Sequence, residues 1–335
     1  MLEMYQPPRD LAATIGVTRI ARLTGLDRTG VEVASAMRPG GHILQVSNGK
    51  GRDWPSAARG ALHEAAELWA AEQPLPFAID AAAEELEGAL PAQWLGGEAA
   101  GGLRSRWVRA QRLDAAGALW VPASAVSCPR VGAGPMPAPW TSNAMGAHRE
   151  LSAALLHASY EGWEREALAQ VLPQGWVPRD FAGRRLDWKG EGYEGFELAV
   201  FDLTPKQAVA PVAGALLRDL EGGPIPLTAG YAARPTLAAA IEAAVLEAAQ
   251  SRQTEIQAAR EDVMLARPID VEGLWSQVRG CKRSRRATAR GPATAAALAR
   301  KFRRPVAFVE LAPGRLPIRV VKVLVPGFRV SELLQ

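Results

Sequence analysis

Two stretches of the chain each carry a pair of glutamates three residues apart, and this spacing constrains the fold more than any other feature. The first reads Glu64-Ala-Ala-Glu67 and the second reads Glu161-Gly-Trp-Glu164-Arg165. Residues i and i+3 share one face of an α-helix, so each stretch presents two carboxylates side by side. Clustered carboxylates repel one another unless cations neutralise them, and hard divalent ions do so well. A single pair is ordinarily a solvated helix face, so its interpretation depends on the rest of the chain.

The composition is that of a globular protein with ample material for a core. Of the 335 residues, 48% are hydrophobic and 22% are charged, and the net charge of only +4 does not imply a general nucleic-acid-binding surface. Cys128 and Cys281 form no metal-binding pattern, which fits a reducing compartment. The polar N-terminus is unlike a signal peptide, and no apolar run reaches the roughly 20 residues that span a bilayer. We therefore expect a cytoplasmic protein without a membrane segment.

Strands and helices alternate in the expected secondary structure. An irregular lead-in over residues 1–16 precedes β-branched runs that predict strands and alanine-rich runs with helical spacing. The predicted helices are 56–73, 79–94, 148–171, 236–264 and 292–302, and the predicted strands include 18–26, 31–37, 42–47, 196–203, 208–217, 306–311 and 318–325. A loop is expected over 267–290. This order favours a mixed α/β (α+β) fold, with helices packed on mixed sheets in one composite domain over 1–335 whose core is 17–330.

The order of a turn followed by a Glu-x-x-Glu helix occurs twice, at 48–69 and at 143–165. It suggests an internal pseudo-repeat whose two helices face each other across a site, with chance similarity between alanine-rich helices as the alternative. The Gly-Lys-Gly turn centred on Lys50 is expected at a helix N-terminus, where anions are favoured. It lacks the spacing of a Walker A loop, and an ordinary loop is the alternative.

A third helical segment adds Glu247-Ala-Ala-Gln250-Ser-Arg252 and, further on, Arg260. Glu247 and Gln250 share a helix face, so Glu247 could complete a carboxylate cluster while the arginines reach phosphate oxygens. The alternative is an amphipathic helix with surface ion pairs of little energetic consequence. The basic run 282–290 is either a solvated loop or a clamp for ATP phosphates or an acidic peptide.

Other motifs for catalysis are absent from the sequence. There is no Gly-x-Ser-x-Gly elbow and no His-Glu-x-x-His zinc motif. The histidines show no metal-ligand spacing, and polar loop or core roles are their commoner use: His42, His63, His148 and His157.

Taken together, the segments resemble the YcaO family of ATP-dependent enzymes that modify peptide backbones, from about residue 18 to residue 329. The resemblance rests on the order and spacing of Thr18-Arg-Ile-Ala-Arg-Leu-Thr-Gly-Leu-Asp-Arg28, Ser47-Asn-Gly-Lys-Gly51, Glu64-Ala-Ala-Glu67, Asn143-Ala-Met-Gly146, Glu161-Gly-Trp-Glu-Arg165, Glu247-Ala-Ala-Gln-Ser-Arg252, Ala259-Arg-Glu-Asp262 and Pro317-Ile-Arg-Val … Val325-Pro-Gly327. The opening segment looks most like the branch associated with TfuA partner proteins, several of which install backbone thioamides.

The resemblance implies ATP and Mg²⁺ as cofactors and a peptide or protein as the substrate. By position, it implies that the metal is held by Glu64, Glu67, Glu161, Glu164 and Glu247, and that the nucleotide is contacted by Lys50, Arg165, Gln250, Arg252 and Arg260. A TfuA-type or peptide-recognition partner is expected, nucleic acid and membrane are not, and a homodimer is the default assembly. The chain has Gly60 and His157 where the family often has Ser, and Leu68 where it often has Arg.

The reaction that the resemblance implies is phosphorylation of a backbone amide oxygen by ATP, leading to a thioamide with sulfide. An amide is a poor electrophile, and phosphoryl transfer mainly demands positioning and charge neutralisation, which agrees with the missing nucleophile motifs. The last residues, 330–335, lack the proline-rich tail of many azoline-forming members of the family that the chain resembles, which favours thioamidation or another non-azoline reaction. The alternatives are a cyclodehydratase that makes thiazolines or oxazolines from Cys, Ser or Thr, and a non-catalytic scaffold, which Gly60 and His157 motivate.

Overall fold

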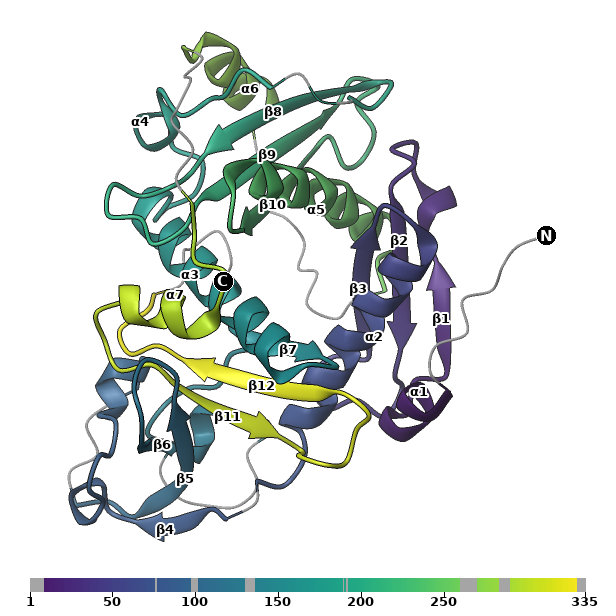
Figure 1. Cartoon of the computed structure of the whole chain (residues 1–335). Coiled ribbons are helices and arrows are strands. Elements are labelled where there is room, and N and C mark those ends of the chain that lie inside the picture. The colour runs from purple at the N-terminus through teal and green to yellow at the C-terminus, as the bar shows by residue number, and fades with distance from the viewer. Residues whose placement is uncertain are drawn as a thin grey trace.

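Three antiparallel sheets form the framework of the protein (Figure 1). The computed structural model describes residues 9–75, 77–97, 102–129, 136–188, 190, 192–259, 270–282 and 290–329. Sheet A contains β1 (Arg19–Arg22), β2 (Glu32–Met37) and β3 (Val46–Gly51), and sheet C contains β8 (Phe196–Asp202), β9 (Val212–Asp219) and β10 (Leu227–Ala233). Sheet B contains β4 (Ile79–Ala81), β5 (Ser105–Arg112), β6 (Ala118–Pro122), β7 (Met145–His148), β11 (Ala307–Leu311) and β12 (Arg319–Leu324).

Helices pack on these sheets, and the fold is therefore of the expected mixed α/β class. The described helices are α1 (Arg9–Ile15), α2 (Trp54–Ala71), α3 (Leu151–Val171), α4 (Pro178–Phe181), α5 (Leu237–Gln257), α6 (Val271–Gly280) and α7 (Ala295–Lys301). Short 3-10 turns cover Thr24–Leu26, Ala83–Glu85, Ala92–Leu95 and Ala123–Ala125. Within the described ranges, no helix combines the length and apolar composition that crossing a bilayer demands.

The three longest helices each follow a strand and lie against it, toward the middle of the molecule in Figure 1. The pairs are β3–α2, β7–α3 and β10–α5, and each strand meets its helix at a glycine. A Cβ added there would collide with helix backbone: 2.1 Å from the Ala61 nitrogen at Gly49, 2.4 Å from the Ala154 oxygen at Gly146, and 2.2 Å from the Ala244 oxygen at Gly230. Glycine thus permits a strand–helix approach that a larger residue prevents.

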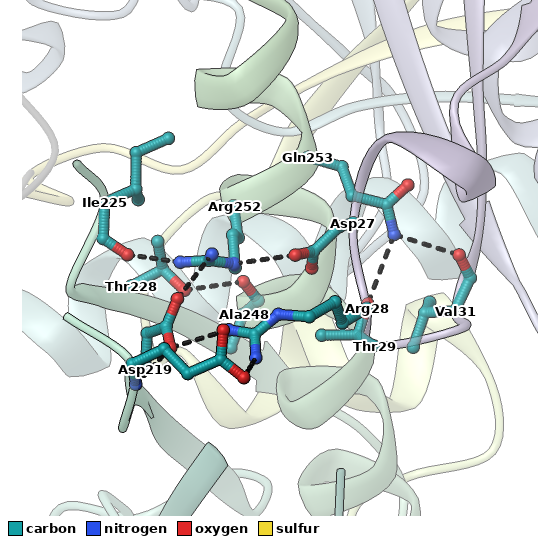
Figure 2. Close-up of polar contacts among 11 residues, drawn as sticks. Asp27, Arg28, Thr29, Val31, Asp219, Ile225, Thr228, Ala248, Arg252 and Gln253 are labelled. Atoms are coloured by element: carbon teal, nitrogen blue, oxygen red, sulfur yellow. Dashed lines mark hydrogen bonds and ion pairs between the residues drawn. The ribbon is translucent and has the colours of Figure 1, made fainter. Parts of the chain in front are cut away.

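A buried ion-pair network joins sheet A to sheet C through α5 (Figure 2). The Arg252 guanidinium on α5 donates to Asp27, at 2.9 Å, to Asp219, at 2.7 Å, and to the Ile225 carbonyl. Arg28 donates to the other oxygen of Asp219 at 2.7 Å. The side chains of Asp27 and Asp219 are each only 2% exposed, so these charges depend on one another.

Most of the strongly patterned elements are confirmed. The predicted helices 56–73 and 148–171 correspond to α2 and α3, and the predicted strands 31–37 and 196–203 correspond to β2 and β8. The start of α2 has a local cause, since the Asp53 side chain accepts a hydrogen bond from the Ser56 amide at 2.8 Å. The helix predicted over 236–264 is α5, which ends at Gln257.

Five predictions about local structure are wrong. Of the strand predicted over 42–47, only residues 46 and 47 belong to β3. The lead-in contains α1, because Leu11 and Ile15, one helical turn apart, are both buried. The helix predicted over 79–94 is instead β4 and two 3-10 turns, and the loop predicted over 267–290 contains α6. The Gly-Lys-Gly segment around Lys50 is part of β3 and not a turn, since its glycines serve the contact with α2.

Replacing Asp219 with Asn would leave Arg252 and Arg28 facing a neutral side chain. We expect the free energy of unfolding, measured by urea denaturation, to fall by about 3 kcal/mol, the scale for an ion pair that loses one partner inside a protein. The matched control is Arg104→Gln, whose ion pair with Glu85 joins side chains 60% and 51% exposed. It should cost at most about 1 kcal/mol. Equal losses in the two variants would contradict the importance of the network.

Candidate functional site

The acidic residues predicted from the sequence converge from separate segments of the chain. Glu64 and Glu67 on α2 and Glu161 on α3 lie close enough to interact electrostatically. The pKa of Glu67 is raised well above its ordinary value, chiefly by burial and then by the charges of Glu161 and Glu64. The carboxylates come from two helices almost one hundred residues apart in sequence. Because their charges repel one another, they depend on the same nearby positive charge.

The second half of the cluster lies between α3 and α5. Burial raises the pKa of Glu164 to about 7, and the charges of Glu247 and Glu161 add to this effect against Arg165. The Arg165 guanidinium contacts Glu161 at 3.3 Å and Glu164 at 3.1 Å. Lys50 on β3 contacts Glu247 at 2.8 Å. The structure therefore brings five predicted metal residues and two predicted nucleotide contacts into one electrostatic cluster.

Strand backbone groups hold some of these carboxylates in place. The Asn48 amide on β3 donates to Glu64 at 2.6 Å, and the Ala233 amide at the end of β10 donates to Glu164 at 3.1 Å. Glu64 on α2 thus accepts from β3, the strand that precedes its own helix. Glu164 on α3 accepts instead from β10, the strand that precedes α5. The first contact lies within the β3–α2 pair, and the second links α3 to the β10–α5 pair.

The positive charge in the cluster is unevenly distributed. Burial acts to raise the pKa of Glu247, but Lys50 and Arg165 outweigh it and the pKa is lowered. Burial also dominates at Glu161, and there Arg165 and Lys322 do not compensate, so the pKa is raised. The demand for additional cations therefore centres on Glu67, Glu161 and Glu164 rather than on Glu247.

Lys322 on β12 belongs to the site and was missed by the sequence analysis. Its side chain is 3% exposed, and its ammonium donates to the Thr141 and Asn143 carbonyls at 2.6 and 2.5 Å. Burial lowers its pKa to about 8, against the attraction of Glu161 and Glu67. A lone lysine within the otherwise apolar end of β12 was the available signal, because lysine is almost never buried without a partner.

Three of the four histidines gather beside the cluster. The rings of His63 on α2 and His148 on β7 lie 6.4 Å apart. Burial, with His148 and Arg59, lowers the pKa of His63 to about 4. His157 on α3 is an exposed residue, yet the protein around it and the charges of Arg234 and Lys50 lower its pKa to about 4 as well. Both imidazoles are therefore neutral at physiological pH.

The remaining predicted nucleotide contacts are placed differently. Gln250 is half-buried on α5, one helical turn after Glu247. Arg252 is engaged in the ion-pair network of Figure 2, where its side chain is 8% exposed and contacts Asp27, Asp219 and the Ile225 carbonyl. Arg260 lies outside the described residues. Arg252 therefore joins the sheets in this structure, and a contact of Arg252 with nucleotide stays a prediction.

The donor set suits magnesium bound together with phosphate. Across the described ranges, no three His, Cys, Asp or Glu side chains are positioned to hold one ion by themselves, so the carboxylates form no closed cage. Mg²⁺ is usually held by one or two carboxylates, with substrate phosphates and waters as its other ligands. Among the residues that the structure describes, the buried Asn48 Oδ1 and Arg165 Nε have no hydrogen-bond partner, and both belong to residues that contact the cluster. A polar ligand bound in the cluster would supply hydrogen-bond partners for these two atoms.

The protein belongs to a family of ATP- and Mg²⁺-dependent enzymes of the cyclodehydratase type. Residues 48–329 match the YcaO family, which is described as YcaO cyclodehydratase, ATP- and Mg²⁺-binding. The chain is thus a member of the YcaO family, and ATP and Mg²⁺ are its cofactors. An uncharacterized protein of Methanothermobacter thermautotrophicus is 32% identical over 272 residues, which are 77% of this chain and 70% of that protein. A protein of Rhizobium leguminosarum bv. trifolii, named only as lying in the tfuA 3′ region, is 27% identical, over 74% of this chain and 64% of its own length.

Solved structures share the fold. YcaO from Methanopyrus kandleri, bound with AMPPCP and Mg²⁺, superposes with a TM-score of 0.71 at 21% identity, covering 97% of this chain and 91% of that one. A heterocyclase in complex with substrate and cofactor gives a TM-score of 0.74 at 17% identity, covering 97% of this chain. The present chain spans only 52% of that heterocyclase.

Glu164→Gln should stabilise the metal-free protein increasingly as the pH rises from 4.5 to about 7. Over this window the folded parent keeps a proton on Glu164 that the unfolded chain releases, so its unfolding free energy declines with rising pH. The variant lacks this titration. His63 and His157 act in the opposite direction, but they do so in both proteins and cancel in the difference. Urea denaturation in the presence of a chelator measures the unfolding free energies of variant and parent at each pH. If the difference between them does not grow with pH, the pKa of Glu164 is not raised.

Proposed function

We propose that this protein activates a backbone amide of a peptide substrate by ATP-dependent phosphorylation of the amide oxygen and converts the amide to a thioamide with sulfide. The observation that carries the proposal is the convergence of carboxylates from three helices, α2, α3 and α5, on one site where Arg165 and Lys50 contact only some of them. Phosphoryl transfer depends on metal ions and cationic side chains that neutralise phosphate, and a buried acidic cluster recruits such ions.

The reaction balances without an oxidant or a covalent enzyme intermediate. Hydrosulfide attacks the amide carbon, and its electron pair forms the C–S bond while the carbonyl π electrons move to oxygen. This oxyanion takes the γ-phosphoryl group of ATP, and ADP leaves. The C–O bond then breaks, C=S forms, and the sulfur proton is carried away on hydrogen phosphate. No nucleophilic side chain is needed, which agrees with the missing serine and cysteine motifs.

The residues of this chain have separable tasks in the proposal. Bound Mg²⁺–ATP supplies the phosphoryl group and the positive charge. Glu64, Glu67, Glu161 and Glu164 would supply carboxylates to Mg²⁺, one or two to each ion, with phosphate oxygens and waters as its other ligands. Arg165 balances the carboxylates of α3. Lys50 neutralises Glu247, and Gln250 follows on the same helix face. Glu164 is buried, whereas the side chains of Lys50 and Glu247 remain 23% and 28% exposed, so the site is open to a ligand on that side.

A TfuA-type partner is part of the proposal. It is supported by the name of the Rhizobium relative, which places that protein in a tfuA 3′ region, and by the resemblance of the opening segment. Sulfide delivery by a partner would suit a chain whose own described residues include no cluster of cysteines, since Cys128 and Cys281 are separate free thiols. A homodimer is retained as the default proposal for assembly.

Cyclodehydration is the second candidate, because the family description and the heterocyclase likeness both favour it. There the nucleophile is a side-chain thiol or hydroxyl of the substrate, and the product is a thiazoline or oxazoline. Mass spectrometry of the peptide separates the two outcomes. Exchange of oxygen for sulfur raises the mass of the peptide, whereas cyclodehydration removes water and lowers it.

Glu64→Gln and Glu164→Gln should each reduce Mg²⁺–ATP turnover by about 100-fold or more, the scale for losing one electrostatic group that stabilises a transition state. Glutamine keeps the oxygen that accepts from the Asn48 or Ala233 amide, so the fold should persist. The matched control is Glu242→Gln on the exposed side of α5, with 47% of its side chain accessible. Full activity in both site variants would show that the carboxylates of Glu64 and Glu164 are not needed for Mg²⁺–ATP turnover.

Titration calorimetry with Mg²⁺ and a non-hydrolysable ATP analogue tests the non-catalytic scaffold. Binding to the parent, weakened in Glu164→Gln and retained in Glu242→Gln, is the outcome expected for an enzyme. Absence of binding at millimolar nucleotide would support the scaffold, which Gly60 and His157 motivate.

A further inference from the structure

A cavity of about 780 Å³ lies outside the acidic cluster. It is bounded by α3, by the end of α7, by residues 207–209 and by Phe328, and none of the predicted site residues lines it. Trp163, Glu166 and Gln170 face it from α3, which is the helix that carries Glu161 and Glu164. The volume is within the range of ordinary ligand sites.

The rim of this cavity is strongly basic. Arg300, Lys301, Arg303 and Arg304 line it and are exposed. Lys301 and Arg304 donate to the Val209 and Pro326 carbonyls at 3.5 and 2.7 Å. Among the ion pairs of the described chain, none involves any of these four cations. Their charge is therefore available to an anionic ligand.

The one carboxylate among the described lining residues, that of Glu166, does not cancel this charge. Glu166 is buried at 6% exposure and already accepts from Gln170 Nε2 at 2.9 Å and from the Arg329 amide at 2.7 Å. The Arg329 guanidinium lies 3.8 Å from the Glu166 oxygen that accepts from Gln170. Glu166 therefore fixes the floor of the cavity and leaves the rim cations without a carboxylate partner.

Aromatic rings form the apolar wall. Phe302 packs edge-on against Phe328 at 4.9 Å and stacks with Trp163 at 6.3 Å, measured between ring centroids. Arg303 follows with φ +55°, a left-handed conformation that arginine rarely adopts. Glycine or asparagine usually occupies that place after a helix, so an arginine there is a local strain that marks a candidate functional site.

We propose that this cavity binds an acidic segment of the peptide substrate that also carries apolar side chains, away from the amide that reacts. The inference rests on the proposed function, since it takes a peptide as the substrate. Carboxylates of the segment would pair with Arg300, Arg303 and their neighbours, while apolar side chains contact Phe302 and Phe328. Because α3 separates cavity and cluster by about one helix diameter, roughly 10 Å, an anchored segment keeps the reacting amide at high local concentration.

Fluorescence anisotropy tests the proposal without ATP or Mg²⁺. The probe is a fluorescein-labelled peptide of alternating glutamate, phenylalanine and leucine, and its comparison peptide has glutamine for glutamate. We expect salt-sensitive binding of the acidic peptide that weakens about fivefold in the Arg300→Gln/Arg303→Gln variant. Phe328→Ala should also weaken binding, although it keeps the charge. Arg106→Gln, at an exposed arginine on β5, is the matched control and should bind like the parent.

Several results would overturn the inference. Equal affinity for the acidic and glutamine peptides, or equal affinity of the double variant and the parent, removes the charge argument. Binding that appears only after deletion of residues 330–335 assigns the cavity to this chain's own C-terminal segment. Tighter binding of a single-stranded oligonucleotide assigns it to nucleic acid. In the parent protein, absence of probe binding together with Mg²⁺–ATP turnover defeats this inference alone, and probe binding without turnover defeats the proposed function alone. Glu164→Gln should bind the probe as the parent does, because Glu164 does not line the cavity.

Discussion

The acidic site depends on close contact between strand and helix backbones at three glycines. Gly49 and Gly146 each precede the first glutamate of their helix by the same 15 residues, at Glu64 and Glu161. Equal spacing and equal packing place the two glutamate pairs at equivalent points of two strand–helix units. Gly230 gives α5 the same kind of contact with β10. A Cβ at any of these positions would push a helix outward and separate carboxylates that must converge.

Convergence creates an electrostatic problem that the chain solves only in part. Lys50 neutralises Glu247, and Arg165 neutralises part of the α3 pair. Burial still raises the pKa of Glu67 and of Glu164, so ionising these carboxylates costs free energy that a bound cation would offset. Folding and cofactor binding are therefore coupled, because cations that stabilise the ionised cluster also stabilise the fold.

The sequence predicts the units whose signals are local. Helical periodicity gave α2 and α3, and the i, i+3 spacing gave the acidic faces. Other features needed the tertiary structure. Lys50 was assigned to a turn because its glycines resemble turn residues, yet they serve packing. The strand β10, Leu227–Ala233, was missed because it contains few β-branched residues. Arg252 lies five residues after Glu247 and was therefore predicted to contact the nucleotide. Only the orientation of α5 shows that it contacts Asp27 and Asp219.

One helix, α3, contributes residues both to the acidic cluster and to the cavity with the basic rim. Its acidic face, Glu161 and Glu164, contributes to a cluster short of positive charge, and its opposite face contributes Trp163 and Glu166 to a cavity with a basic rim. Surfaces of opposite sign on one rigid element hold their ligands at a fixed separation. A substrate that is anionic at one point and phosphorylated at another would satisfy both surfaces at once. The rigidity of α3 would then set how many residues lie between the anchor and the reacting amide.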